Sequence, residues 1–234
     1  MRCIGIIGAM EVEVATLKET LKDVQITRKA SMEFYAGVLE SKKVVVVRSG
    51  IGKVNAAVCT QILIDDFQAE VVINTGIAGS LNADINIGDI VVSTDLVHHD
   101  MDAVAFGYPV GQVPQMEAFS FQSDVALRKI AVRACREVNP DIQVFEGRIA
   151  SGDQFIASQD VKDRIVANFD AWAVEMEGAA IAHAAYLNNV PFLVIRAISD
   201  KADGSAQMDY PTFEAQAAQH SLKLTLRILK DIQA

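Results

Sequence analysis

Short, mostly apolar runs rich in isoleucine and valine recur along the chain, with little alternation of apolar and polar positions. Continuous runs of this kind are typical of strands that are covered on both faces of a sheet. They predict strands over residues 3–9, 44–50, 70–76, 89–97, 172–176 and 192–199.

Segments with apolar residues at helical spacing alternate with these runs. Because strands and helices alternate, we predict an α/β fold with a mostly parallel sheet and helices on both faces. No linker, repeat or low-complexity segment interrupts the pattern, so one domain over residues 1–234 is expected. The predicted helices, the last of which begins at its proline, cover residues 11–22, 53–67, 124–138, 178–188 and 211–232.

The composition narrows the possible functions. The net charge is −9 and the basic residues are scattered, which argues against a surface for nucleic acid or an anionic membrane. Cys3, Cys59 and Cys135 have no metal or redox spacing and are interpreted as free thiols in a reducing compartment. No stretch has the length of a signal peptide or a membrane span, so a soluble, cytoplasmic protein is expected.

Small residues and acids follow several predicted strands at their carboxyl ends, where α/β sheets bind ligands. Glu13, Glu177 and Asp200 each follow a strand, and Arg196 lies inside the last strand, where its charge could pair with one of them. Taken singly, each acid is explained by a helix cap or a solvated helix position. Together at one edge of a sheet, they predict a polar functional site.

Glu175 and Glu177 form an unusual pair, because they flank Met176 in an otherwise apolar stretch with no lysine or arginine nearby in sequence. Strand alternation would place both acids on one side and Met176 on the other. A helix N-terminus accounts for one of the two acids. Burying a carboxylate costs several kcal/mol unless something pairs with it, so a partner or a ligand is expected.

Other motifs favour structural explanations. The segment GIGKVNAA (50–57) lacks the spacing of dinucleotide and phosphate-binding motifs and fits glycines at a turn and a helix start. The segment HHDMD (98–102) has the residue types of metal ligands but no established spacing, and we interpret it as loop polarity. No serine stands in a nucleophile-elbow context. We expect neither a metal nor a cofactor.

Eight motifs nevertheless occur in the order and spacing of one family. Over residues 2 to about 230, the chain resembles the bacterial 5'-methylthioadenosine/S-adenosylhomocysteine nucleosidases of the nucleoside phosphorylase superfamily. The motifs are IGIIGAMEVEV, SGIGKVNAA, INTGIAGS, IGDIVVS, HDMDAVAFGYPVGQVP, SGDQFI, AVEMEGAAIAH and VPFLVIRAISDKAD.

The resemblance implies a three-layer αβα sandwich around a central mixed, partly closed sheet, working as a homodimer. It implies hydrolysis of the N-glycosidic bond of 5'-methylthioadenosine and S-adenosylhomocysteine, and of 5'-deoxyadenosine. Adenine and a 5-substituted ribose would be released, in methionine salvage and in the recycling of by-products of S-adenosylmethionine.

The resemblance also implies roles for particular residues. Glu177 would bind the ribose hydroxyls, Asp200 would be the general acid, and Glu13 would hold the attacking water. Ser199 would orient the acid, and Arg196 would anchor the water or Glu13. The other substrate-binding positions would be Met10, Ile51, Ala78, Gly79, Phe155, Ile156, Glu175, Met176, Tyr210 and Phe213. A loop would reach the partner's site and close over the 5'-alkylthio group through Ala103, Phe106, Tyr108 and Pro114.

Two positions depart from the family's pattern. Ile77 stands where several relatives carry serine or threonine beside the water, and Ala103 replaces a bulkier residue of the partner loop. These departures leave the reaction type intact and bear on the ranking of substrates.

Three alternative functions stay open. An aminofutalosine nucleosidase shares the chemistry. A purine or uridine phosphorylase would need cations around phosphate, whereas the first loop, GAMEVE, offers acids. A non-catalytic nucleoside sensor would not need a general acid.

Overall fold

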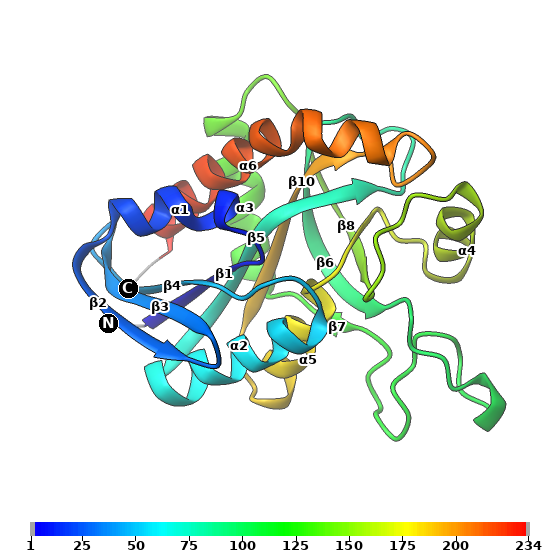
Figure 1. The fold of residues 1–234 in the computed structure, drawn as a ribbon, viewed down its shortest axis with the longest axis horizontal. Helices are drawn as coiled ribbons and strands as arrows, with labels where there is room; N and C mark the ends of the chain where they lie inside the picture. The colour runs from blue at the N-terminus through cyan, green and yellow to red at the C-terminus, as the bar shows by residue number, and fades with distance from the viewer. Residues whose placement is uncertain (1–2, 233–234) are drawn as a thin grey trace.

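The computed structural model describes residues 3–232 and places its strands in one mixed sheet with helices on both faces (Figure 1). The strands are β1 (Cys3–Gly8), β2 (Lys22–Lys29), β3 (Met32–Leu39), β4 (Lys42–Arg48), β5 (Ala69–Ser80), β6 (Ile90–His98), β7 (Phe121–Gln122), β8 (Val144–Ser151), β9 (Ala173–Glu175) and β10 (Phe192–Asp200). The helices are α1 (Glu11–Thr20), α2 (Lys53–Phe67), the short 3-10 helix η1 (Val104–Phe106), α3 (Val125–Val138), α4 (Gln159–Phe169), α5 (Gly178–Leu187) and α6 (Ala206–Asp231).

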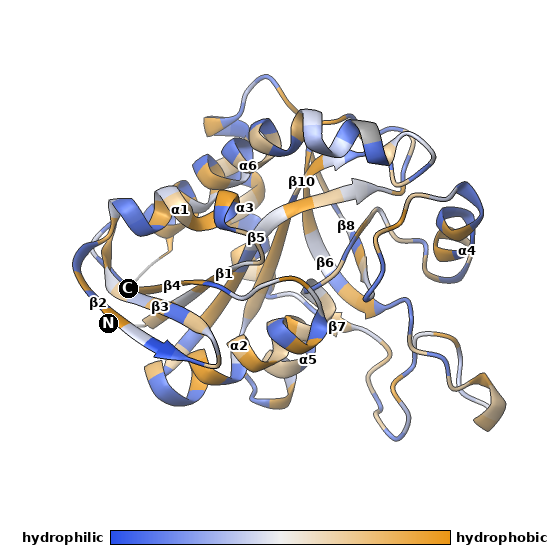
Figure 2. Ribbon diagram, viewed as in Figure 1, coloured by the Kyte–Doolittle hydropathy of each residue, from blue (hydrophilic) through white to orange (hydrophobic). Residues whose placement is uncertain are grey.

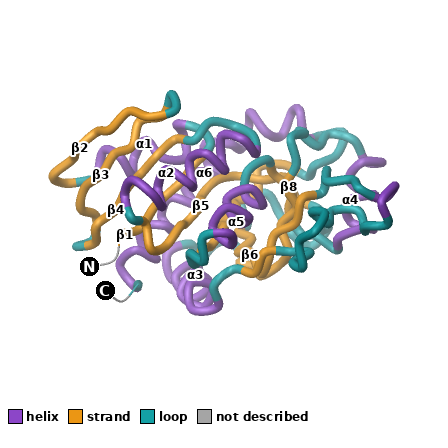
Figure 3. The backbone as a smooth tube through the Cα atoms, turned by 90° about the horizontal axis from the view of Figure 1, so that it is seen from below, coloured by secondary structure: helices purple, strands orange, loops and turns teal. Residues whose placement is uncertain are grey.

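Strand β4 shows why the apolar runs lack alternation. Val44 and Val46 belong to the core under α1, α3 and α6, whereas Val45 and Val47 belong to the core under α2 and α5. Figure 1 shows these two groups of helices on opposite sides of the sheet, and apolar residues run along the strands between them (Figure 2). Seen from below, α2 and α5 lie side by side across one face (Figure 3). Both faces of the strand are therefore buried.

The sheet closes on itself at one end. Its order is β10-β6-β8-β9-β5-β1-β4-β3-β2, and β10 also pairs with β5, so that β5, β10, β6, β8 and β9 enclose a barrel. This confirms the three-layer αβα architecture with a mixed, partly closed sheet. The expectation of a mostly parallel sheet is wrong, because β2–β3, β3–β4, β5–β9, β6–β7 and β6–β10 are antiparallel.

Each predicted strand and helix is present, with boundaries that differ by a few residues. The sequence patterns did not predict β2, β3, β7, β8 or α4. Every residue of β2 is exposed, so this edge strand carries no apolar run, and β8 contains Glu146 and Arg148. Helix α6 begins at Ala206 rather than at Pro211, because a turn closed by Asp203 Oδ1 and the Ser205 N–H (2.8 Å) starts the helix earlier.

The segment between β6 and β7 contains only η1 as regular structure and projects away from the sheet (Figure 1). Phe106, the last residue of η1, is 84% exposed. Within residues 3–232, none of the helices combines the length and the apolar character needed to cross a bilayer.

Candidate active site

A cavity of about 210 Å³ opens at the carboxyl ends of β1, β5, β9 and β10. It brings together the three acids that the strand-end rule selected. The predicted site residues that line it are Met10, Glu13, Ile51, Ala78, Gly79, Phe155, Glu175, Met176, Glu177, Ser199, Asp200 and Tyr210. Its wall also includes Ile77.

The other predicted site residues lie outside this lining. Ile156 lines a small adjoining cavity that shares Phe155 and Asp200 with the main one. Arg196 is buried behind Glu175, and Phe213 is half-buried on α6. The loop residues Ala103, Phe106, Tyr108 and Pro114 do not line the cavity of their own chain.

Glu13 reaches the cavity because α1 begins directly after β1 and turns this side chain back over the strand end. Its Oε2 accepts hydrogen bonds from the N–H groups of Ala9 (2.7 Å) and Met10 (2.9 Å), and its Oε1 accepts one from Ile77 (3.1 Å). Burial raises the pKa of Glu13, while Arg196 and the three N–H groups oppose this shift. A solvated helix position is therefore the wrong interpretation of Glu13.

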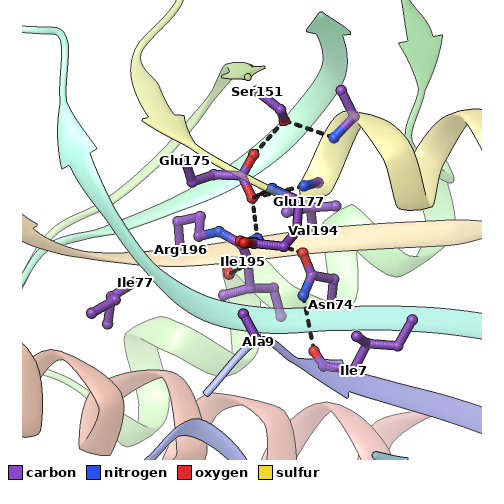
Figure 4. A network of polar contacts seen from close by, with 12 residues as sticks. Ile7, Ala9, Asn74, Ile77, Ser151, Glu175, Glu177, Val194, Ile195 and Arg196 are labelled. Atoms are coloured by element: carbon purple, nitrogen blue, oxygen red, sulfur yellow. Dashed lines mark hydrogen bonds and ion pairs between the residues drawn. The ribbon is translucent and has the colours of Figure 1, made fainter. Parts of the chain in front are cut away.

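The Glu175 carboxylate finds its partner on β10, in the buried guanidinium of Arg196, whose side chain is 2% exposed (Figure 4). The same guanidinium donates to Asn74 Oδ1, and Ser151 Oγ donates to Glu175 Oε1. Burial alone would lower the pKa of Arg196, but Glu175 and the other nearby carboxylates raise it. The sequence patterns did not indicate Asn74 or Ser151. An asparagine inside an apolar strand was the one signal that could have identified Asn74.

Glu175 also holds the start of α5. Its Oε2 accepts from the N–H groups of Gly178 (2.7 Å) and Glu177 (3.2 Å), which lack partners inside the helix. The helix N-terminus was thus the right explanation for one acid of the pair. Strand β9 ends at Glu175, so alternation does not continue, and Met176 lines the same cavity as both acids rather than the opposite side.

Glu177 is the residue that precedes α5, and its carboxylate is the less neutralised of the pair. Its Oε1 accepts from the Gly52 N–H (2.9 Å), and its Oε2 lies 4.0 Å from Arg196 Nη2. Burial and the negative charge of Glu175 raise the pKa of Glu177 to about 8, although Arg196 opposes the shift. Glu177 can therefore take up or release a proton close to neutral pH.

Asp200 is the last residue of β10 and is buried at the cavity wall. Ser199 Oγ lies 2.9 Å from its Oδ2, and the Ala202 N–H donates to its Oδ1 (2.8 Å). Burial raises the pKa of Asp200 against these two hydrogen bonds, which favours retention of a proton. Gly79 is required beside it, because a Cβ at that position would lie 2.8 Å from Asp200 Oδ1.

The outer wall of the cavity is largely apolar. Phe155 and Tyr210 meet edge to face with ring centroids 5.8 Å apart, and the Tyr210 hydroxyl contacts Met10 Sδ (3.1 Å) and Glu214 Oε1 (3.2 Å). Ile51 at the mouth is about half exposed. This wall suits the flat and apolar parts of a ligand, while the acids suit its polar part.

The interpretation of residues 98–102 as loop polarity is wrong for the two histidines, which are buried. Burial, with the positive charge of Lys53, lowers the pKa of His98 to about 4, so it is neutral at pH 7. Asp100 pairs with Lys53 at 2.5 Å. Within residues 3–232, no group of three or more histidine, cysteine, aspartate or glutamate side chains is placed to hold a metal ion.

The family model of the phosphorylase superfamily matches residues 3–230, and the chain belongs to this superfamily. The chain is 46% identical over 230 residues to the 5'-methylthioadenosine/S-adenosylhomocysteine nucleosidase of Bacillus licheniformis, covering 98% of this chain and 99% of that one. It belongs to the family of 5'-methylthioadenosine/S-adenosylhomocysteine nucleosidases.

Solved structures agree. The Neisseria meningitidis nucleosidase in complex with methylthio-immucillin-A matches with a TM-score of 0.95 at 41% identity, covering 99% of this chain and 100% of that one. A Helicobacter pylori protein described as futalosine hydrolase matches with a TM-score of 0.93 at 37% identity, covering 99% and 98%.

The ion pair between Arg196 and Glu175 predicts a large effect on stability. Arg196→Met leaves a buried carboxylate without its cation, and we expect the free energy of unfolding to fall by about 3–5 kcal/mol. Denaturant unfolding measures the loss. The control is Arg128→Met, which breaks the more exposed pair of Arg128 with Glu146 and should cost under about 1 kcal/mol. Equal losses in the two variants would contradict the assignment.

Proposed function

We propose that this protein hydrolyses the N-glycosidic bond of 5'-methylthioadenosine and S-adenosylhomocysteine, releasing adenine and the 5-substituted ribose. The supporting observation is the convergence of Glu13, Glu177 and Asp200 from different strand ends on one largely apolar cavity. Cleavage of this bond develops positive charge on the sugar, which carboxylates stabilise. We assign the activity to one domain over residues 1–234, acting in the cytoplasm.

Asp200 is the proposed general acid. Adenine leaves poorly as an anion, so a proton delivered to its N7 lowers the barrier. Burial raises the pKa of Asp200, and this keeps the proton available for transfer. Ser199 Oγ fixes the orientation of the carboxyl group from 2.9 Å.

Glu13 is the proposed base that holds and activates the attacking water. Its carboxylate is oriented by three backbone N–H groups and faces the cavity. Ile77 contributes no hydroxyl there, so Glu13 carries more of the positioning of the water. Arg196 donates to Glu175 and Asn74, and its charge opposes the rise in the pKa of Glu13 that burial causes. We assign Arg196 a positioning role.

Glu177 is the proposed ligand of the ribose 2'- and 3'-hydroxyls. A carboxylate has enough acceptor sites for two hydroxyls and still keeps the Gly52 hydrogen bond. Phe155 stacks on the base, and backbone atoms of Ile156 read the edge of the adenine. Met10 and Tyr210 form the wall near the 5'-substituent.

Water, rather than phosphate, is the proposed nucleophile. Backbone N–H groups at strand ends can bind anions, but those of Ala9, Met10 and Ile77 are occupied by Glu13. Among the described residues that line the cavity, there is no lysine or arginine. A phosphate ion would meet carboxylates without a cation to offset their repulsion.

Adenine release should proceed at the same rate with and without phosphate. The assay compares methylthioadenosine, adenosylhomocysteine, adenosine and aminofutalosine, with chromatography of the sugar product. We expect a free 5-substituted ribose and the highest kcat/KM for the two thioethers. Ribose 1-phosphate as the main product would indicate a phosphorylase. Preference for aminofutalosine, which the likeness to the H. pylori protein makes worth testing, would indicate the related activity. Binding without turnover would indicate a sensor.

Asp200→Asn should lower kcat by about 10²–10⁴-fold, because asparagine keeps the shape but cannot transfer a proton. The dissociation constant for an uncleavable C-nucleoside analogue should change far less. Asp163→Asn is the matched control: Asp163 is exposed on α4, and its carboxylate accepts from Gln159 Nε2 (2.6 Å) outside the cavity. A kcat near the wild-type value in Asp200→Asn would show that another group is the acid.

The proposed assembly is a homodimer in which each chain's loop covers the partner's cavity. Apolar side chains are exposed on the loop at Val104 and Phe106, and on the α2–α5 face at Val54 (75% exposed) and Leu187. Exposed apolar groups gathered on one face typically mark an interaction surface. A two-fold dimer would cover both sets and add apolar surface over the 5'-alkylthio group.

Phe106→Ala should raise KM for methylthioadenosine more than KM for adenosine, which lacks the thioether. Light scattering at micromolar concentration should show a dimer. Val125→Ala is the control, because Val125 is exposed on α3, away from the α2–α5 face, and should change neither value. A fully active monomer, or equal effects on both substrates, would rule out a shared site.

A further inference from the structure

Three segments around the cavity are joined by a closed ring of hydrogen bonds. Lys53 Nζ donates to Asp100 Oδ1 (2.5 Å), and the Asp153 N–H donates to Asp100 Oδ2 (2.9 Å). Asp153 Oδ1 in turn accepts from the backbone N–H of Lys53 (2.8 Å). The ring links the start of α2, the residues after β6 and the residues after β8.

Each member of the ring is adjacent to a part of the site. Lys53 directly follows Gly52, whose N–H donates to Glu177 Oε1. Asp153 precedes Phe155 of the cavity wall by two residues, and Asp100 begins the projecting loop. None of the three ring residues lines the cavity.

The ring is well suited to fix the direction of the Gly52 N–H. Gly52 has a φ of +98° and no side chain whose packing could hold its peptide group in place. The direction of its N–H therefore depends on the contacts of the neighbouring residues. A Cβ there would lie 3.2 Å from Asp153 Oδ1, which leaves the position little room for a side chain.

The central ion pair of the ring is stronger than an exposed one. The side chains of Lys53 and Asp100 are 20% and 18% exposed. Burial would raise the pKa of Asp100, but the hydrogen bonds from Lys53 and from the Asp153 N–H outweigh burial and lower it. The carboxylate is therefore ionised at neutral pH, and the pair is only weakly screened by solvent.

We propose that Lys53, Asp100 and Asp153 are positioning residues that aim the Gly52 N–H at Glu177, fixing one carboxylate oxygen so that the other is presented to the ribose hydroxyls. This inference rests on the proposed function, because it takes Glu177 as the ribose ligand. Asp200 and Glu13 are held by other contacts, from Ser199 and from backbone groups after β1 and in β5. Loss of the ring should therefore weaken ribose binding and spare the chemical step.

The first test breaks the ring at two points, with Lys53→Met and Asp100→Ala. Each should raise KM for methylthioadenosine about tenfold, the effect of one misdirected hydrogen bond to a charged group, with kcat within about twofold. The affinity for free adenine, which has no hydroxyls, should change less than about threefold. Lys53→Arg should restore most of the loss. Lys29→Met, which breaks an exposed lysine–aspartate pair (2.7 Å to Asp66), is the control and should change nothing.

The second test is a double-mutant cycle of Lys53→Met with Glu177→Gln, read as the affinity for an uncleavable C-nucleoside. If the ring acts through Glu177, Lys53→Met should weaken binding less than about twofold in the Glu177→Gln background. Independent, multiplicative effects would overturn the proposal, as would a fall in kcat with unchanged KM. Weakened binding of adenosylhomocysteine alone would instead make Lys53 a ligand of its amino-acid tail. If the wild type releases no adenine, the proposed function fails, while this binding cycle still decides the role of the ring.

Discussion

The buried pairing of Arg196 with Glu175 sets the electrostatics of the whole cavity. One guanidinium lies among the carboxylates of Glu175, Glu177 and Glu13, and its shortest contact is with Glu175. Because the charge of Arg196 is mostly neutralised by Glu175, it offsets the burial of Glu13 and Glu177 only in part. Burial therefore raises the pKa of each of these two acids. A cation that lined the cavity would lower these pKa values and also attract anions. The charge balance thus favours water over phosphate as the nucleophile.

The barrel closure makes this arrangement possible. Pairing of β10 with β5 brings Arg196 beside Gly76, and pairing of β5 with β9 brings Glu175 to the same strand end. The close approach leaves no space for a side chain at two positions of β5: a Cβ at Gly76 would lie 2.5 Å from Glu13 Oε1, and one at Gly79 would lie 2.8 Å from Asp200 Oδ1. The two glycines are therefore needed because they leave room for the carboxyl groups of Glu13 and Asp200, and not because a turn requires them.

The sequence predicted the features whose cause is local. The apolar runs of β4 and β10 mark strands covered on both faces, and the strand-end rule selected Glu13, Glu177 and Asp200 correctly as cavity residues. The exposed strand β2 carries no such signal, because solvent imposes no apolar pattern on it. The partner of Glu175 could not be assigned, because Arg196 is distant in sequence and only the closure of the barrel brings the two together. The ring through Asp100 also joins segments distant in sequence, because the parallel pairing of β6 with β8 places Asp100 beside Asp153.

The three acids of the cavity are held by different contacts, so the residue proposed to bind the ribose is held separately from the two proposed to act in the reaction. Asp200 is held by the Ala202 N–H just after β10, and Glu13, on α1, is held by backbone groups after β1 and in β5, so both are fixed at strand ends. Glu177 instead accepts from the N–H of Gly52, which directly precedes α2. The groups proposed for proton transfer and for water attack are thus held at the strand ends. The group proposed to bind the ribose is held by a separate set of contacts, which include the ring of Lys53, Asp100 and Asp153. Because the two sets share no hydrogen bond, ribose binding can be weakened without displacing the acid or the group that holds the water.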